Sequence, residues 1–232
     1  EQGTELQHRA GDLIAQELLM PPDHVLATGD ERTALHGAFP DSPGIVLISG
    51  TGMICIGRNA RGEEARSGGW GWLLDGAGAA FDLGHQGLQL SLRMADGRLP
   101  DHPLRQRLWH AMHCHSSAQV KAMVVNPDFG AAGFAALAPL VVTAAEEGLM
   151  EASHILRRSA HALTECVITV GGRLELAAPQ LAARGGAIEH LQGYRRMIED
   201  VLSHQLPQAR WSAASGDACD GALTLARDLR QR

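Results

Sequence analysis

The sequence has few aromatic residues, no clustered cysteines and no long apolar run. Aromatics make up 4% of the 232 residues, while Ala, Gly and Leu are abundant, which favours helices packed closely on a sheet through small residues. The cysteines are far apart and form neither a CxxC pair nor a small secreted-domain pattern, so we expect reduced thiols. No apolar run reaches the roughly 20 residues of a membrane span, and the N-terminus lacks signal-peptide features. We therefore expect a soluble cytoplasmic protein without a membrane partner.

The sequence also lacks a basic stripe. It carries 20 Lys plus Arg against 26 Asp plus Glu, for a formal net charge of −6. Without a cluster of cations that could neutralise a run of phosphates, nucleic acid is not an expected partner. The 45% hydrophobic content is sufficient for a large folded core.

The hydrophobic pattern that is present alternates between helical and strand periods. Helical spacing covers residues 4–19, and short β-branched or apolar runs follow, punctuated by glycine. We expect strands at residues 24–27, 45–48, 54–57, 166–170 and 210–213, and helices at 33–37, 77–94, across most of 104–164, around the Gly185-Gly186 break and after 217. This order predicts an α/β fold.

Two glycine turns follow predicted strands. Gly50, Thr51 and Gly52 form the turn of a predicted hairpin, and Gly171 and Gly172 follow the strand predicted at 166–170. Glycine lets the backbone approach a ligand, and successive N–H groups can hold an anion. Each turn could equally be only a turn or a helix terminator.

Several motifs in a fixed order carry a family resemblance. The run IVLISGTG at residues 45–52 is followed by SGGWGWLL at 67–74. Residues 138–148 then resemble a helical insert, and residues 170–172 and 216–227 resemble an adenosine-binding turn and a closing motif. Together they resemble the N-acetylglucosamine kinase and BadF/BadG/BcrA/BcrD-type ATPase family. The resemblance implies a ribonuclease-H-like, actin-type fold of two lobes around a cleft, ATP and Mg²⁺ as cofactors, and phosphorylation of N-acetylglucosamine or glucosamine.

The resemblance also implies roles for individual residues. Asp30 matches the base that accepts the proton of the sugar hydroxyl, although an Asp here could instead cap the next helix. Gly69 and Trp70 match the sugar-contacting loop. The resemblance places Thr51 and Gly52 near the phosphates, and Gly171, Gly172 and Gly216 near the nucleoside.

Two departures from the family pattern stand out. The family follows its Gly-Gly-Trp-Gly loop with Gly-Asp-Glu-Gly, whereas residues 75–78 read Asp-Gly-Ala-Gly, so Asp75 is a displaced candidate for the sugar-binding acid and Asp82 a weaker one. No Asp-Gly-Gly-Gly-Thr phosphate loop occurs. We therefore expect an incomplete first lobe at residues 1–42, a second lobe with a helical insert at 43–217, and a terminal helix at 218–232 that returns to the first lobe. We expect this segment alone to be a poor kinase.

Other interpretations stay open. A relative without the phosphate loop could be a non-catalytic sugar-binding or regulatory protein. The dehydratase-activating ATPases of the same fold use an iron–sulfur cluster, which the cysteine positions here do not resemble. His110, His113, Cys114 and His115 share helical spacing, but a solvated helix end explains them better than a metal site. A homodimer is implied by the family only.

Overall fold

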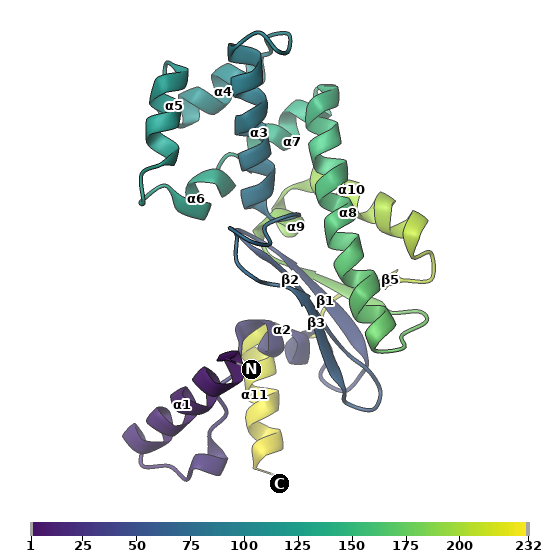
Figure 1. Ribbon diagram of the computed structural model, residues 1–232. Coiled ribbons are helices and arrows are strands. Elements are labelled where there is room, and N and C mark those ends of the chain that lie inside the picture. Colours follow the sequence, from purple (N-terminus) through teal and green to yellow (C-terminus); the bar gives the residue numbers. More distant parts are fainter. Residues whose placement is uncertain (1, 231–232) are drawn as a thin grey trace.

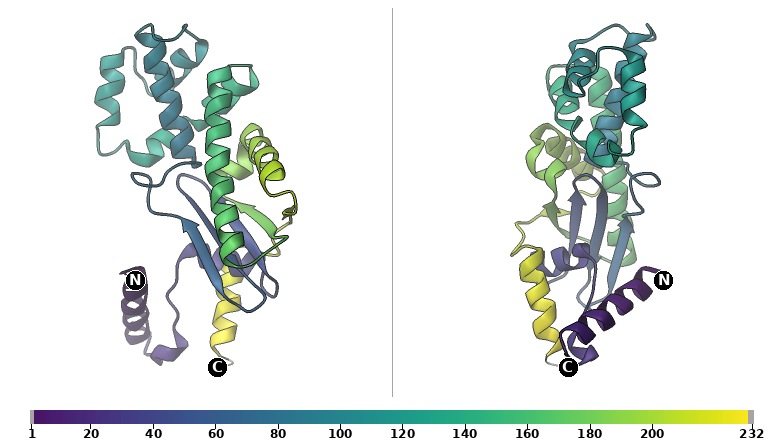
Figure 2. Two further views of the ribbon diagram at one scale, coloured as in Figure 1. Left: turned by 45° about the vertical axis from the view of Figure 1, so that its right-hand side comes forward. Right: turned by 90° about the vertical axis from the view of Figure 1, so that its left-hand side faces the viewer.

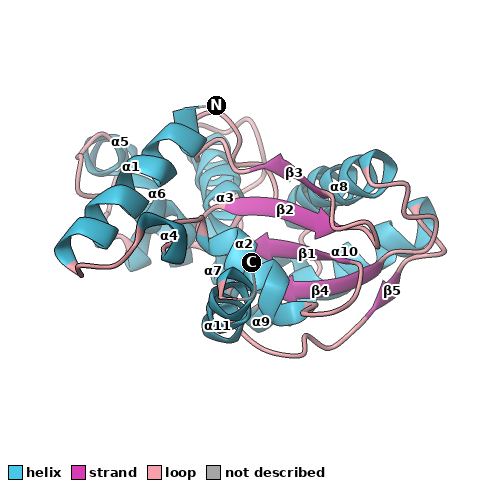
Figure 3. Ribbon diagram, turned by 90° about the horizontal axis from the view of Figure 1, so that it is seen from below, coloured by secondary structure: helices cyan, strands magenta, loops and turns pink. Residues whose placement is uncertain are grey.

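The computed structural model describes residues 2–230, with a mixed β-sheet at their centre (Figures 1 and 3). The described strands form one five-stranded sheet in the order β3-β2-β1-β4-β5. β1, β2 and β3 pair antiparallel, whereas β4 and β5 run parallel to β1. The strands are β1 Gly44–Ser49, β2 Met53–Arg58, β3 Glu64–Gly68, β4 Gln180–Arg184 and β5 Arg210–Trp211.

β1 is central because its side chains are apolar on both faces. Ile45, Val46 and Leu47 have no exposed surface, and the two faces of this strand belong to different cores. Ile45 and Leu47 lie in the larger core, and Val46 lies in the smaller one. A strand covered on both sides reads as a continuous apolar run rather than an alternating one.

α8 covers the sheet face of Ile45 and Leu47 and packs along β2, β3 and β1. It is the longest of a group of helices that extends beyond the carboxyl end of β1 (Figures 1 and 2). The others form a helical insert between β3 and α8, or follow β4. The helices are α3 Ala80–Ala95, α4 Pro103–Ala111, α5 Ser117–Val124, α6 Gly130–Ala135, α7 Ala138–Glu146, α8 Met150–Arg173, α9 Gly186–His190 and α10 Gln192–Gln205.

Two helices form a thin layer on the opposite face. α2 (Asp30–Ala38) and α11 (Ala218–Leu229) pack tightly against each other. They approach through glycines, since a Cβ at Gly37 would lie 1.7 Å from the Asp217 carbonyl oxygen and one at Gly221 would lie 1.8 Å from that of Thr33. α1 (Gln2–Glu17) and the 3₁₀ helix η1 (Pro22–His24) lie apart from the sheet (Figure 2).

Two predicted strands are wrong. Residues 24–27 form the end of η1 and an extended connection, so Asp30 begins α2 instead of following a strand. Residues 166–170 belong to α8. Their β-branched side chains favoured a strand, but Val167 and Val170 are spaced for one helix face and both are fully buried. Tertiary packing therefore overrides the local propensity.

The predicted hairpin at 45–57 and the last helix are confirmed, and the helix predicted at 77–94 begins three residues later. The sequence interpretation missed β3 and β4. β4 reads Gln-Leu-Ala-Ala-Arg and has no β-branched residue, so only its partners β1 and β5 identify it as a strand. The division into lobes stays a prediction.

Within residues 2–230, no single helix is long and apolar enough to cross a membrane. One sharply bent pair, Gly130–Glu146 with Met150–Arg173, passes that test by length and composition alone.

Candidate functional site

The turn after β1 exposes backbone at the carboxyl edge of the sheet. Its base is fixed, because the buried Ser49 hydroxyl donates to the Gly78 carbonyl at 2.8 Å and the Ala80 N–H donates to the Gly50 carbonyl at 2.8 Å. Thr51 and Gly52 are exposed. A Cβ at Gly52 would meet nothing within 4 Å, so the turn opens onto free space.

A second glycine turn lies beside it. β4 runs parallel to β1, so Gly185 and Gly186 leave the sheet at the same edge as Gly50. Gly185 has φ of +97°, and a Cβ there would lie 2.5 Å from the Ser49 carbonyl oxygen. Only glycine fits this position. The two turns adjoin, since a Cβ at Gly50 would lie 3.8 Å from the Gly186 nitrogen, and we call the pair of turns the cradle.

Sequence reasoning treated Gly185-Gly186 as a break between helices, although a Gly-Gly pair after a short apolar run was the available signal. The sequence predicted instead that Gly171-Gly172 follows a strand and lies near the nucleoside, but residues 166–170 do not form a strand. Both residues lie in the last turn of α8. They line an apolar cavity of about 420 Å³ together with Ile168, Leu176 and Leu206.

The predicted nucleotide-binding residues therefore divide into two groups. A Cβ at Gly171 would lie 3.8 Å from the Ile45 side chain, at the opposite end of β1 from Thr51 and Gly52. Gly216 is linked to the cradle instead, because the Arg184 guanidinium at the end of β4 donates to its carbonyl at 2.9 Å. The nucleotide-binding roles of all five residues stay predictions.

The Gly-Trp loop after β3 has a backbone that requires glycine. Gly68, Gly69 and Gly71 have φ of +82°, +79° and +88°, values that side-chain-bearing residues rarely adopt. Between them Trp70 is 66% exposed, and the Arg66 guanidinium lies over its ring at 5.3 Å. The loop presents an indole face to solvent, the surface on which a sugar ring can stack.

Trp70 and Asp75 line one cavity of about 520 Å³ between this loop and α8, which also contains Ser67, Glu165 and Cys166. Burial raises the pKa of Cys166, and the charges of Asp75 and Glu165 raise it further against the lowering effect of a hydrogen bond with Ser67. Cys166 is therefore mainly a protonated thiol. The carboxylates are the polar groups available to ligand hydroxyls or amines.

Asp30 is the first residue of α2 and is exposed. Its Oδ1 accepts from the Glu31 N–H at 3.0 Å, and its carbonyl accepts from the Thr33 hydroxyl at 2.8 Å. The N-cap is Gly29, so Asp30 does not cap α2 in the strict sense. Its charge at a helix N-terminus is favourable, and it leaves carboxylate oxygen available to a ligand.

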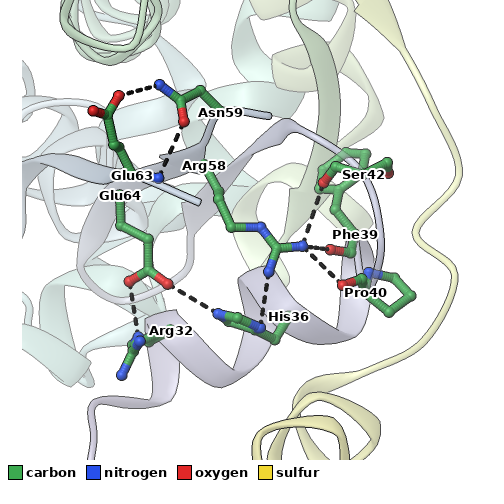
Figure 4. Close-up of polar contacts among 9 residues, drawn as sticks. All are labelled: Arg32, His36, Phe39, Pro40, Ser42, Arg58, Asn59, Glu63 and Glu64. Atoms are coloured by element: carbon green, nitrogen blue, oxygen red, sulfur yellow. Dashed lines mark hydrogen bonds and ion pairs between the residues drawn. The ribbon is translucent and has the colours of Figure 1, made fainter. Parts of the chain in front are cut away.

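A polar network holds α2 to the edge of the sheet (Figure 4). Glu64 on β3 accepts from Arg32 at 2.8 Å and bonds His36 Nε2 at 2.9 Å. Arg58 lies 3.2 Å from His36 Nδ1 and donates to the Phe39 and Pro40 carbonyls. Because arginine only donates, Nδ1 is the acceptor and Nε2 carries the proton given to Glu64.

The charge of Glu64 is stabilised by this network. Burial by itself raises the pKa of Glu64, but the hydrogen bonds from His36 and Arg32 outweigh that effect and lower it below its ordinary value. The side chain of Glu64 is 24% exposed and that of His36 only 6%. No sequence pattern predicts this network, since its members lie up to 32 residues apart.

Arg66 connects the two predicted sugar-side groups. It lines a cavity of about 440 Å³ with Thr28, Glu31 and Arg32 around the start of α2, and its guanidinium stacks on Trp70. Neither this cavity nor that of Trp70 and Asp75 includes Asp30. The convergence of Asp30 and Trp70 on one bound sugar therefore stays a prediction.

No cluster of three or more His, Cys, Asp or Glu side chains placed to hold a metal occurs in residues 2–230. His110, His113, Cys114 and His115 are among these residues.

The mixed five-stranded sheet in the order β3-β2-β1-β4-β5, with helices on both faces, has the actin-like ATPase fold. The family model described as "BadF/BadG/BcrA/BcrD ATPase family" matches residues 3–223. The chain belongs to this family.

Two curated relatives carry kinase names. The chain is 26% identical over 208 residues to an N-acetylmuramic acid/N-acetylglucosamine kinase of Clostridium acetobutylicum, covering 88% of the chain and 67% of the relative. It is 30% identical over 196 residues to an N-acetyl-D-glucosamine kinase of Dictyostelium discoideum, covering 81% and 60%.

Solved structures confirm the fold. A putative N-acetylglucosamine kinase from Chromobacterium violaceum aligns with a TM-score of 0.69 at 27% identity, over 86% of this chain and 65% of that one. One from Porphyromonas gingivalis aligns with a TM-score of 0.64 at 17% identity, over 88% and 66%. The chain thus spans roughly two thirds of the length of these relatives.

Proposed function

We propose that this chain forms the sugar-side part of an ATP-dependent kinase that phosphorylates an amino sugar, N-acetylglucosamine or glucosamine. The observation that carries the proposal is the cradle of the 50–52 and 185–186 turns at one sheet edge, in a chain whose relatives are named as amino-sugar kinases. The exposed Trp70 face and the carboxylate of Asp75 supply the stacking surface and the polar partner that a sugar needs.

In this proposal Asp30 orients the attacking hydroxyl and accepts its proton. ATP with Mg²⁺ would supply the transferred phosphoryl group, whose chemistry depends mainly on positioning and charge neutralisation. Thr51, Gly52, Gly185 and Gly186 would offer backbone N–H groups and the Thr51 hydroxyl to phosphate oxygens. The network of Glu64, His36 and Arg58 would keep α2, and hence Asp30, in place on the sheet.

Binding and turnover together test the proposal. In calorimetric titration of the 232-residue chain with N-acetylglucosamine and glucosamine, Trp70→Ala is expected to weaken binding about tenfold or more. Where ADP formation is measured, Asp30→Asn is expected to lower kcat by about 10²-fold or more and to change sugar affinity much less. Asp128→Asn, at an exposed acid of the helical insert, is the matched control.

Absence of saturable binding for both sugars would refute the proposed substrate class. Saturable binding without ADP formation would instead support the non-catalytic sugar-binding interpretation.

A further inference from the structure

A further cavity, away from the glycine turns, lies between α3 and α8. Its volume is about 290 Å³, small for a nucleotide or a drug-sized ligand. Each helix contributes residues at positions i, i+3, i+4 and i+7, so two matching stripes face each other. The lining residues are Gln86, Gln89, Leu90 and Arg93 from α3, and Glu151, His154, Ile155 and Arg158 from α8.

The cavity concentrates hydrogen-bond donors on an apolar floor. Leu90 and Ile155 are buried. Arg93 and Arg158 form no ion pair within residues 2–230. Asp96 lies close enough to Arg93 for that charge to help lower its pKa. Asp96, however, is already paired with Arg98 at 2.6 Å. One acid, Glu151, shares the lining, so two guanidinium groups face a single carboxylate.

The cavity is also connected to the candidate site. Arg158 donates to Gln86 Oε1, and Gln86 Nε2 donates to Asp82 Oδ1 at 2.5 Å. Asp82 Oδ2 accepts from the Gly78 N–H at 3.0 Å and from the Ser159 hydroxyl at 2.6 Å. The Gly78 carbonyl in turn accepts from Ser49, at the end of β1, and from Tyr194. Gln86 is only 7% exposed, so this chain of bonds is mostly shielded from water.

We propose that the cavity between α3 and α8 binds a phosphate group, inorganic or as a small phosphate monoester, through Arg93, Arg158 and His154. Guanidinium groups are suited to phosphate because their planar donors match its oxygens. Together, Arg93, Arg158 and His154 offer more N–H donors than the two oxygens of a carboxylate can accept, so a group with more acceptor oxygens fits the cavity better. Glu151 at the same wall offers an acceptor to a protonated phosphate oxygen or a hydroxyl of the monoester.

Calorimetric titration of the 232-residue chain with inorganic phosphate, glycerol phosphate and acetate tests this site at fixed ionic strength. Phosphate and its monoester are expected to bind saturably at one site, and acetate to bind much more weakly. Arg93→Gln is expected to weaken phosphate binding about tenfold to a hundredfold, the loss expected for a charge-assisted hydrogen bond. Arg93 takes no part in the buried Gln86 network, so this variant leaves that network intact.

Arg157→Gln is the matched control, because it removes the same charge from the neighbouring position of α8. Arg157 lies outside this cavity and pairs weakly with Asp200, at 3.7 Å. Equal losses in the Arg93 and Arg157 variants would show only bulk charge attraction and would overturn the proposal. Acetate binding as tight as phosphate binding would overturn it as well.

Amide hydrogen exchange locates the bound phosphate independently of affinity. Phosphate is expected to slow amide exchange in peptides covering residues 84–95 and 150–160. It is also expected to slow exchange in the segment around Gly78, which Asp82 connects to Gln86 by hydrogen bonds. Protection confined to the 50–52 and 185–186 turns would place phosphate in the nucleotide cradle and overturn the proposal. Sugar binding takes no part in these measurements, so failure of this site leaves the proposed kinase function unaffected.

Discussion

At the residue scale, two Gly-Gly pairs of this chain have opposite structural roles. Gly185 has a left-handed backbone, and a side chain there would collide with the carbonyl at the end of β1. A Cβ at Gly172, in the last turn of α8, would meet nothing within 4 Å. The same dipeptide is thus obligatory at one position and replaceable at the other.

We expect Gly185→Ala to destabilise the fold by about 1–3 kcal/mol, because alanine would be strained at this φ and would press on Ser49. Gly172→Ala is expected to be neutral or stabilising by up to about 1 kcal/mol, because alanine favours a helix. Urea unfolding of both variants checks the difference. Equal effects would contradict the conformation of the turn after β4.

At the element scale, α2 depends on ionic contacts as well as on apolar packing. Leu35 and Phe39 bury its inner side against Val46, Ile56 and Ala182. Arg32 and His36 tie its outer side to Glu64 on the edge strand (Figure 4). The Glu64 side chain is 24% exposed, and the His36 side chain is buried. Removal of the Glu64 carboxylate would leave the buried His36 N–H without its acceptor, which costs free energy.

We expect Glu64→Gln to lower the free energy of unfolding by about 1–3 kcal/mol at pH 7. The pKa of Glu64 is lowered in the fold, so its contribution is present above its unfolded pKa of about 4.3 and is lost as pH falls below that value. The difference in the free energy of unfolding between the wild type and Glu64→Gln should therefore become smaller in acid. Unfolding measured from pH 7 to pH 3 tests the trend.

Glu175→Gln is the control, because Glu175 is 74% exposed and its pair with Arg61 is solvated. We expect it to change stability little at any pH. A pH-independent gap for Glu64→Gln would show that the acid acts by packing alone.

At the scale of the whole molecule, one hydrophobic core joins the sheet to the helical insert. Cys55 on the central hairpin and Cys114 beyond α4 belong to the same cluster of buried side chains. Cys219, at the start of α11, is exposed. Burial raises the pKa of Cys55 far above its ordinary value, which further suppresses its reaction in the folded state.

Thiol labelling is expected to separate these classes. Cys219 should react at once, and the Cys219→Ser variant should lack that phase. Cys55 and Cys114 should become reactive together, because a continuous core opens as a unit. The opening free energy derived from their labelling should equal the free energy of global unfolding. Labelling of Cys114 at lower urea than Cys55 would show that the insert unfolds independently of the sheet.

The family, the central hairpin and the Gly-Trp loop could be predicted from the sequence alone. These features are local. A continuous apolar run forms β1, and glycines form the turn after β1 and the Gly-Trp loop after β3. The family model matches residues 3–223. Asp30, Trp70 and Asp75 came from the family resemblance, and their roles stay predictions.

Which Gly-Gly pair ends a strand, and how α2 is held on the sheet, could not be predicted without the fold. β4 has weak intrinsic strand propensity and exists because β1 and β5 bond it on both sides, whereas residues 166–170 have strong strand propensity but pack as part of α8. Likewise, the Glu64 network and the cavity between α3 and α8 join residues remote in sequence. Such contacts depend on which faces the chain buries, and that is settled by the whole core at once.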